Sequence, residues 1–285
     1  MILRYRDGHD EETNPSGNQK FLYRTWLGRV FLRLLTRPFL TEFMGWFLNR
    51  RISKLKNKAF MKKAGINPEE YELDNIRCFN DLFKRKMKPG YRTIDPDPSI
   101  LISPCDSRLR AYRLDNNAVF EIKDSYYRAG DLIQDEALAR QYENGYFLIF
   151  RLDVTDYHRY VYIDDGHQER NIRIKGIFHT VNPIALEHYN FFKTNSREYT
   201  ILHTENFGDV IQCEVGALMV GKISNNAENN TFRKGDEKGC FEFGGSTIVL
   251  MIKDVVDIDP DILDNTAEGI ETRVLMGEHI GIRRH

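Results

Sequence analysis

The 285-residue sequence has few cysteines, few prolines and no long apolar run, and each shortage excludes a class of protein. Its four cysteines are too scattered for a CxxC metal site and too few for a disulfide-dense secreted scaffold, which favours a reducing, intracellular compartment. Nine prolines with 41% hydrophobic residues are not the composition of a disordered or collagen-like chain. The first nineteen residues are polar and acidic, so they do not predict a secretory signal.

Acidic residues are also nearly absent from one part of the chain. The stretch from Lys20 to Lys63 contains twelve basic residues and a single acid, Glu42, so it carries a charge of +11. The formal net charge of the whole chain is −1, so the other residues carry −12. A charge asymmetry of this kind indicates an interaction surface.

This basic stretch has the pattern of amphipathic helices. Arg29, Arg33 and Arg37 recur every four residues beside aromatic and aliphatic side chains, which puts a cationic stripe next to an apolar face. We expect one helix to end at Pro38 and a second to run over residues 42–58.

Three functions of the basic stretch are open from its sequence. Its longest uncharged run, residues 43–49, is too short to span a bilayer, which takes roughly 20 apolar residues. Aromatic residues beside arginines suit the surface of an anionic membrane, but the same helices could pack on the protein's own core. Nucleic-acid binding is disfavoured, because the stretch is more apolar than a phosphate-tracking groove requires and no DNA- or RNA-binding motif accompanies it.

The rest of the chain predicts a β-rich domain. A short helix is expected over residues 78–87, and short runs of β-branched and aromatic residues follow, separated by turn residues. The expected strands are 118–123, 146–152, 159–163, 172–175, 199–204, 209–223 and 247–253. We therefore predict an α+β protein: an N-terminal basic amphipathic helical region, 1–76, and a mostly antiparallel β catalytic domain, 77–285. No metal-ligand spacing is present in the sequence.

The string Gly244-Gly245-Ser246-Thr247 precedes an apolar run and allows two interpretations. It is ordinary turn chemistry, in which glycine supplies an unusual backbone conformation before a strand begins. Alternatively, the Ser246 hydroxyl is a nucleophile that attacks the preceding carbonyl within its own chain, with the help of a base.

Seven further blocks accompany this string in a fixed order. They are residues 78–92 (CFNDLFKRKMKPGYR), 102–106 (ISPCD), 156–159 (DYHR), 179–183 (HTVNP), 205–208 (ENFG), 214–217 (EVGA) and 234–239 (KGDEKG). Together with the glycine pair and Ser246, they resemble the phosphatidylserine decarboxylase family of the prokaryotic, pyruvoyl-dependent type. The resemblance covers roughly residues 77 to 281.

The resemblance implies a proenzyme that cuts itself between Gly245 and Ser246. In the family the serine hydroxyl attacks the glycine carbonyl to form an ester, elimination leaves dehydroalanine, and hydrolysis yields a pyruvoyl group and ammonia. The products would be a β chain, 1–245, and an α chain, 246–285, held together noncovalently. The pyruvoyl group derived from Ser246 would be the covalent cofactor.

The resemblance also implies the reaction of the mature enzyme. The amine of phosphatidylserine forms a Schiff base with the pyruvoyl ketone, and the conjugated amide carbonyl accepts the electrons released as the carboxylate leaves as CO2. A general acid then protonates the former α-carbon before phosphatidylethanolamine is released. Such an enzyme is a lyase of phospholipid biosynthesis. The resemblance also implies a peripheral membrane protein at the cytoplasmic face of the cell membrane.

Besides Ser246, two residues receive catalytic roles from the resemblance. Asp106 of the SPCD block matches the charge-relay aspartate, although Cys105 and Ser107 replace the usual neighbours, and His158 matches the histidine associated with decarboxylation. The family carries its relay histidine three residues after His158, where this chain has Val161. Either His179 replaces that base or His158 serves both steps, and both alternatives stay open at this point.

Two other functions are compatible with the sequence. A related pyruvoyl-dependent decarboxylase of a soluble amino acid would share the motifs, but it would not need a basic, membrane-docking segment. A noncatalytic lipid-binding family member would explain the missing histidine at Val161. The expected partners are phosphatidylserine and an anionic membrane surface, with no nucleic acid, and assembly into a homo-oligomer is left open.

Overall fold

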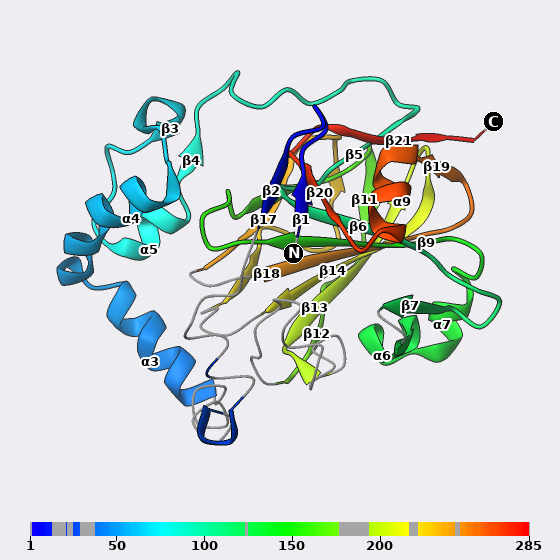
Figure 1. Cartoon of the computed structure of the whole chain (residues 1–285), viewed down its shortest axis with the longest axis horizontal. Helices are drawn as coiled ribbons and strands as arrows, with labels where there is room; N and C mark the ends of the chain where they lie inside the picture. The colour runs from blue at the N-terminus through cyan, green and yellow to red at the C-terminus, as the bar shows by residue number, and fades with distance from the viewer. Residues whose placement is uncertain are drawn as a thin grey trace.

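The computed structural model describes residues 2–12, 21, 25–28, 38–122, 125–176, 194–216, 222–242 and 246–284. Its main element is an 11-stranded sheet, antiparallel except where β1 runs parallel to β20 (Figure 1). The strand order is β16 (Thr231–Phe232), β11 (Gly166–Gln168), β13 (Arg197–Thr204), β14 (Gly208–Gly216), β18 (Ser246–Ile252), β9 (Tyr146–Leu152), β6 (Ser107–Arg113), β20 (Glu271–Val274), β1 (Ile2–Arg4), β2 (Asp10–Glu12), with β12 (Ile172–Ile174) on β13.

Four smaller sheets lie around the main one. One of them, β10 (Arg159–Val161), β17 (Glu237–Phe241) and β15 (Ile223–Asn225), leads directly into β18. The others are β19 (Val256–Ile258), β21 (His279–Arg283) and β5 (Ile100–Ile102); β3 (Tyr71–Glu72) and β4 (Lys86–Met87); and β7 (Val119–Ile122) and β8 (Ser125–Arg128). This architecture confirms the predicted α+β class with largely antiparallel sheets.

The helices are short. They are α3 (Pro38–Leu48), η1 (Arg51–Lys56), α4 (Asn57–Ala64), η2 (Pro68–Glu70), α5 (Phe79–Phe83), α6 (Ala129–Ile133), α7 (Glu136–Arg140) and α9 (Pro260–Ala267). One of them, α9, packs against the interior strands β6 and β20 of the main sheet. In Figure 1, α3, α4 and α5 lie on one flank, and α6 and α7 lie on the opposite flank. Among the described residues, no helix is long and apolar enough to cross a bilayer.

The core lies around β9 and β18, in which every residue is buried. Their sequences, YFLIFRL and STIVLMI, are nearly continuous apolar runs, as expected for strands that are covered on both faces. The hydrophobic side chains of these strands belong to one contiguous cluster with those of β14 and β6. The start of β18, where Ser246 lies, is therefore buried at the centre of the sheet.

The prediction of one helix over residues 42–58 is wrong, because the structure has separate helices there with different bounds. The helix α3 starts at Pro38, since proline is well suited to a first helical position, and it ends at Leu48. The Ser53 hydroxyl donates to the carbonyl of Leu48 at 2.8 Å and so satisfies the helix end before η1 begins. The helix predicted before Pro38 falls largely outside the described residues.

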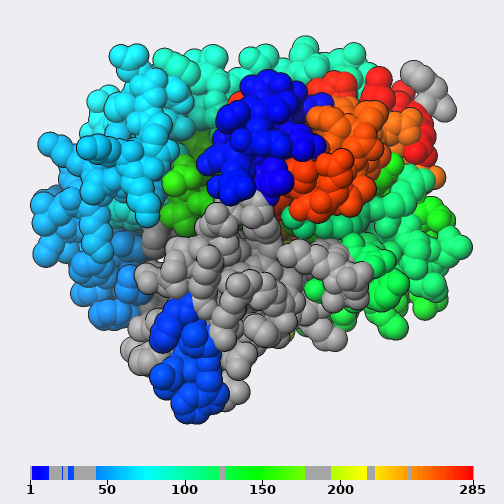
Figure 2. All heavy atoms as spheres, viewed as in Figure 1, coloured from blue at the N-terminus to red at the C-terminus, as the bar shows by residue number. Residues whose placement is uncertain are grey.

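The N-terminal hairpin β1–β2 belongs spatially with the C-terminal part of the chain. Leu3 pairs with Glu271 of β20, and Arg6 Nη2 lies 2.7 Å from Asp259 Oδ2. Figure 2 shows this hairpin, in dark blue, against the orange and red C-terminal segment. The domain boundary between residues 76 and 77 stays a prediction.

Candidate active site

Ser246 is the first residue of β18, in the middle of the main sheet. It pairs with Gly216 of β14 on one side and with Leu152 of β9 on the other. Its side chain is fully buried, and its Oγ has no hydrogen-bond partner among the described residues. A buried hydroxyl without a hydrogen-bond partner lowers the stability of the fold, so its presence calls for a functional explanation. The predicted cleavage residue Gly245 lies outside the described residues.

Phe241 and Glu242, the last described residues before Ser246, are held by hydrogen bonds and an ion pair. Phe241, the last residue of β17, donates its amide to the carbonyl of His158 at 2.9 Å. Glu242 accepts a hydrogen bond from Asn80 Nδ2 at 3.3 Å and lies 3.5 Å from Lys84 Nζ. The chain therefore enters the cleavage segment from a fixed position beside His158.

His158 lies directly before β10 and is completely buried. Its Nδ1 lies 2.9 Å from the carbonyl oxygen of Asp156, and its ring centroid lies 4.1 Å from that of Phe83 in α5. Because a carbonyl oxygen only accepts, Nδ1 carries the proton in this contact. This hydrogen bond fixes the orientation of the imidazole ring.

Asp106 lies in the turn before β6, where its carboxylate is buried and held by two partners. Arg92 binds both carboxylate oxygens, at 3.0 Å through Nε and at 2.5 Å through Nη2, and the Met276 amide donates to Oδ1 at 2.9 Å. Among the described residues, no histidine is hydrogen-bonded to it. The amide of Val161 donates to the carbonyl of Pro104 at 2.9 Å, so position 161 lies beside this turn.

The Asp106 turn and Ser246 lie at the same end of the main sheet. Strands β6 and β18 flank β9, in which Arg151 pairs with Arg108 and Leu152 pairs with Ser246. Since neighbouring strands lie about 4.8 Å apart, the two backbones are roughly 10 Å apart. The predicted residue His179 lies outside the described residues, so its place relative to this end of the sheet stays a prediction.

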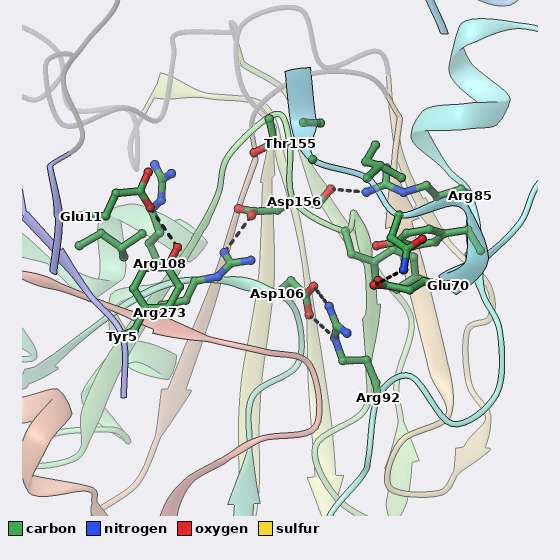
Figure 3. A pocket seen from close by; sticks show the side chains of 17 residues that line it. Tyr5, Glu11, Glu70, Arg85, Arg92, Asp106, Arg108, Thr155, Asp156 and Arg273 are labelled. Atoms are coloured by element: carbon green, nitrogen blue, oxygen red, sulfur yellow. Dashed lines mark hydrogen bonds and ion pairs between the residues drawn. The ribbon is translucent and has the colours of Figure 1, made fainter. Parts of the chain in front are cut away.

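An open cavity of about 260 Å³ lies at the same end of the sheet (Figure 3). Its wall is polar and contains four arginines and four carboxylates: Arg85, Arg92, Arg108, Arg273, Glu11, Glu70, Asp106 and Asp156. Asp156 Oδ1 accepts from Arg273 Nη1 at 2.8 Å, and burial nevertheless raises the pKa of this carboxyl above its ordinary value. Sequence reasoning assigned no role to these arginines, because only the fold brings them together.

A buried charged pair supports the strands on the other side of Ser246. Lys238 Nζ of β17 lies 2.8 Å from Glu214 Oε1 of β14, and both side chains are buried. Burial raises the pKa of Glu214 even though Lys238 opposes that shift. Since Gly216 pairs with Ser246 two residues further along β14, this pair ties the small sheet to the strand that contacts Ser246.

No cluster of three or more histidine, cysteine or acidic side chains suited to a metal ion occurs within the described residues. Cys78, Cys105, Cys213 and Cys240 are all buried and free. Burial also raises the pKa of the Cys213 thiol, which is a poor condition for a nucleophile. The candidate nucleophile of this site is therefore a hydroxyl.

Comparison with known proteins identifies the chain. The family model for phosphatidylserine decarboxylase matches residues 79–282. The phosphatidylserine decarboxylase proenzyme 2 of Clostridium acetobutylicum is 47% identical over 274 residues, covering 95% of this chain and 94% of the relative. The phosphatidylserine decarboxylase proenzyme of Clostridium botulinum is 42% identical over 295 aligned residues, covering both chains completely, and that of Ruminiclostridium cellulolyticum is 43% identical over 267 residues, covering 91% and 89%.

These matches define a decarboxylase, that is, a carboxy-lyase. The chain belongs to the phosphatidylserine decarboxylase family, as its sequence motifs predicted.

Proposed function

We propose that this chain is a proenzyme that cuts itself before Ser246 and then converts phosphatidylserine to phosphatidylethanolamine and CO2. The observation that carries the proposal is the buried, unpartnered Oγ of Ser246 at the start of a central strand. A covalent pyruvoyl group fits there, because it would be made from this residue and would replace the hydroxyl with a carbonyl. When present, that group supplies an electron sink for the departing carboxylate.

The protein's own residues supply the proton transfers. Nε2 of His158 takes or returns a proton, because Nδ1 is held by the carbonyl of Asp156. The family's charge-relay role for Asp106 requires a histidine beside it, and its carboxylate is held in place by Arg92 and the Met276 amide. The base for self-cleavage is either His158 or His179, since Val161 has no group that takes a proton.

Intact-mass analysis and a decarboxylation assay test this function together. Wild-type protein should appear as two fragments, 1–245 and 246–285, and should release CO2 from phosphatidylserine. Ser246→Ala should stay a single chain of 33.5 kDa and be inactive. A wild-type chain that remains uncut would overturn the pyruvoyl assignment, and cut protein that decarboxylates only soluble amino acids would overturn the substrate.

Two further variants separate the candidate bases. His179→Ala should block cutting if His179 is the base, and it should cut normally if His158 serves both steps. His158→Ala should abolish decarboxylation in either case, because it removes the buried imidazole beside the site. Cutting followed by normal decarboxylation in His158→Ala would remove this residue from the mechanism.

We also propose that α3 and η1 dock the enzyme peripherally on an anionic membrane at the cytoplasmic face. Phe43, Trp46, Ile52 and Leu55 are exposed large apolar side chains, and Leu55 is 83% exposed. The Arg50 guanidinium lies 4.4 Å above the Trp46 ring, which places positive charge beside this apolar surface. Aromatic and aliphatic groups beside cations are typical of segments that lie in the membrane interface.

Vesicle sedimentation tests the docking surface. Wild-type protein should bind vesicles that contain phosphatidylglycerol more strongly than pure phosphatidylcholine vesicles, and Leu55→Glu should lose most of that binding. Tyr126→Glu is the matched control, because Tyr126 is 75% exposed on β8, away from α3. Equal binding by both variants and the wild type would refute this role for η1.

A further inference from the structure

Arg85 has an environment that is unusual for a buried arginine. It follows α5 and is only 2% exposed. Its guanidinium carbon lies 4.5 Å from the centre of the Tyr71 ring, and its Nη2 donates to the carbonyl of Asp156 at 3.4 Å. Its Nε and Nη1 have no hydrogen-bond partner among the described residues, and within those residues no carboxylate forms an ion pair with it.

The other arginines of the same cavity are neutralised. Arg92 is paired with Asp106, Arg273 with Asp156, and Arg108 with Asp153, at 2.5–3.0 Å. Figure 3 shows Arg85 reaching toward Asp156 from the side opposite to Arg108 and Arg273. Arg85 is therefore the arginine of this cavity wall that forms no ion pair with a described residue, although the Glu11 and Glu70 carboxylates line the same cavity.

A bound anion would give the Arg85 guanidinium the partner that its Nε and Nη1 lack among the described residues. A buried charge without a partner is unfavourable, and the planar guanidinium fork matches the oxygen atoms of a phosphate or carboxylate. The cavity of about 260 Å³ has room for a phosphate group and several waters, since one water takes about 30 Å³.

A second possible donor lies next to Arg85 in this cavity. The hydroxyl of Tyr157 accepts a hydrogen bond from the Met87 amide at 3.2 Å, and its own proton is available to a ligand. Burial raises the pKa of Tyr157 to about 12, so the phenol stays protonated at neutral pH. A neutral phenol beside a guanidinium is a suitable pair for an anionic oxygen.

The same carbonyl oxygen connects this place to the candidate catalytic histidine. Asp156 O accepts from Arg85 Nη2 and lies 2.9 Å from His158 Nδ1. One backbone carbonyl therefore links Arg85 in the cavity wall to the buried imidazole that we assign to proton transfer. Tyr157, between Asp156 and His158 in the chain, faces the cavity as well.

We infer that Arg85 and Tyr157 form a phosphate-binding subsite. Resting on the proposed function, its ligand is the phosphodiester of the phosphatidylserine head group, which Arg85 positions beside His158. Free inorganic phosphate has the same chemistry and is the other source to be separated by experiment. Arg85 is thus a substrate-positioning residue.

Ligand binding is measured first, without reference to activity. The thermal unfolding midpoint of the full chain is compared in inorganic phosphate, in glycerophosphoserine and in chloride at equal ionic strength. Both phosphate ligands should raise the midpoint of wild-type protein, and Arg85→Met should lose this shift while Arg85→Lys keeps part of it. Arg113→Met is the matched control, because Arg113 also lies over a tyrosine ring, at 4.7 Å, but on the exposed far end of β6.

Kinetics with phosphatidylserine in mixed micelles identify the source of the phosphate. If the head group binds there, Arg85→Met should raise KM about 10- to 100-fold with kcat largely retained, because a charged hydrogen bond to a non-reacting group is lost. If only inorganic phosphate shifts the unfolding midpoint, and Arg85→Met leaves KM unchanged, the ligand of the subsite is a free anion. Equal midpoint shifts in wild type and Arg85→Met would overturn the subsite. An Arg85-dependent shift in a protein that does not decarboxylate phosphatidylserine would refute the proposed function and leave the subsite in place.

Discussion

The buried pair of Lys238 and Glu214 leads to a quantitative prediction for Lys238→Met. The lysine Nζ lies 2.8 Å from Glu214 Oε1 and 3.0 Å from Asn225 Oδ1, and Lys238 and Glu214 are at most 1% exposed. Methionine fills similar space but leaves the Glu214 charge uncompensated in the core. Removing one partner of a buried pair lowers the free energy of unfolding by about 3–5 kcal/mol. In a chain of this size that lowers the unfolding midpoint by roughly 6–20 °C.

The loss should depend on pH with a definite sign. Burial already raises the pKa of Glu214 in the wild type, and removing Lys238 raises it further. A carboxyl with a raised folded-state pKa contributes stability below its unfolded-state pKa and loses that contribution as pH rises through the folded-state value. The deficit of Lys238→Met is therefore largest at pH 8 and shrinks toward pH 5, where Glu214 takes up a proton in the variant.

Thermal unfolding in the uncut Ser246→Ala background measures this effect without dissociation of fragments. The double variant Glu214→Gln with Lys238→Met is the control, because it removes both charges and should recover most of the lost stability. The reasoning fails if Lys238→Met unfolds within about 1 kcal/mol of its parent, well below the expected cost of a broken buried pair. It also fails if the double variant is no more stable than the single one.

Three further predictions concern packing and a helix cap. Gly239→Ala should lower the unfolding free energy by about 1–3 kcal/mol and slow the appearance of fragments in timed mass spectra, because a Cβ there would lie 2.5 Å from Ser224 O. Phe150→Ala, in the centre of β9, should cost about 3–5 kcal/mol in urea unfolding, and a loss under 1 kcal/mol would contradict its full burial. Asp135→Ala should cost about 1 kcal/mol in the same assay, because the carboxylate caps α7 by accepting from the Leu138 amide at 2.9 Å; an unchanged midpoint would show that the cap is dispensable.

Strands with apolar runs were predictable from the sequence. The expected strand 146–152 coincides with β9, and 247–253 matches β18 to within one residue at each end. Side chains on both faces of these strands are buried, so each strand is a continuous apolar run that can be recognised from its composition. The strand β6, SRLRAYR, was missed because its arginines give it the pattern of a surface segment.

The arginines of the central strands are compatible with burial only because of partners on distant strands. Arg151 of β9 binds both oxygens of Glu271 on β20, and both side chains are buried. The attraction of Arg151 lowers the pKa of Glu271 even though burial opposes it. Such pairs join residues far apart in the chain, so a local pattern cannot indicate them.

The candidate site, too, was predictable from the sequence only in part. The local string around Ser246 left two interpretations open, and the catalytic role of Ser246 was predicted from the resemblance of all the blocks to the family. The cavity beside Asp106 was not predicted, since Arg85 and Arg92 lie far along the chain from Asp156 and Arg273. The sequence motif around His158 contained Asp156, but its carbonyl contacts with Arg85 and His158 appear only in the folded chain.

The central position of β18 has a consequence for the lifetime of the mature protein. The proposed cut before Ser246 would leave the middle strand of the main sheet, together with β20 and β21, on a forty-residue fragment. Each fragment would then lack its neighbours in the sheet, so we expect the uncut chain to fold before the cut occurs. After one complete unfolding, the two pieces would have to meet again by diffusion, and dilution alone would prevent recovery. Heating and cooling should therefore restore the uncut Ser246→Ala chain but not the cut enzyme.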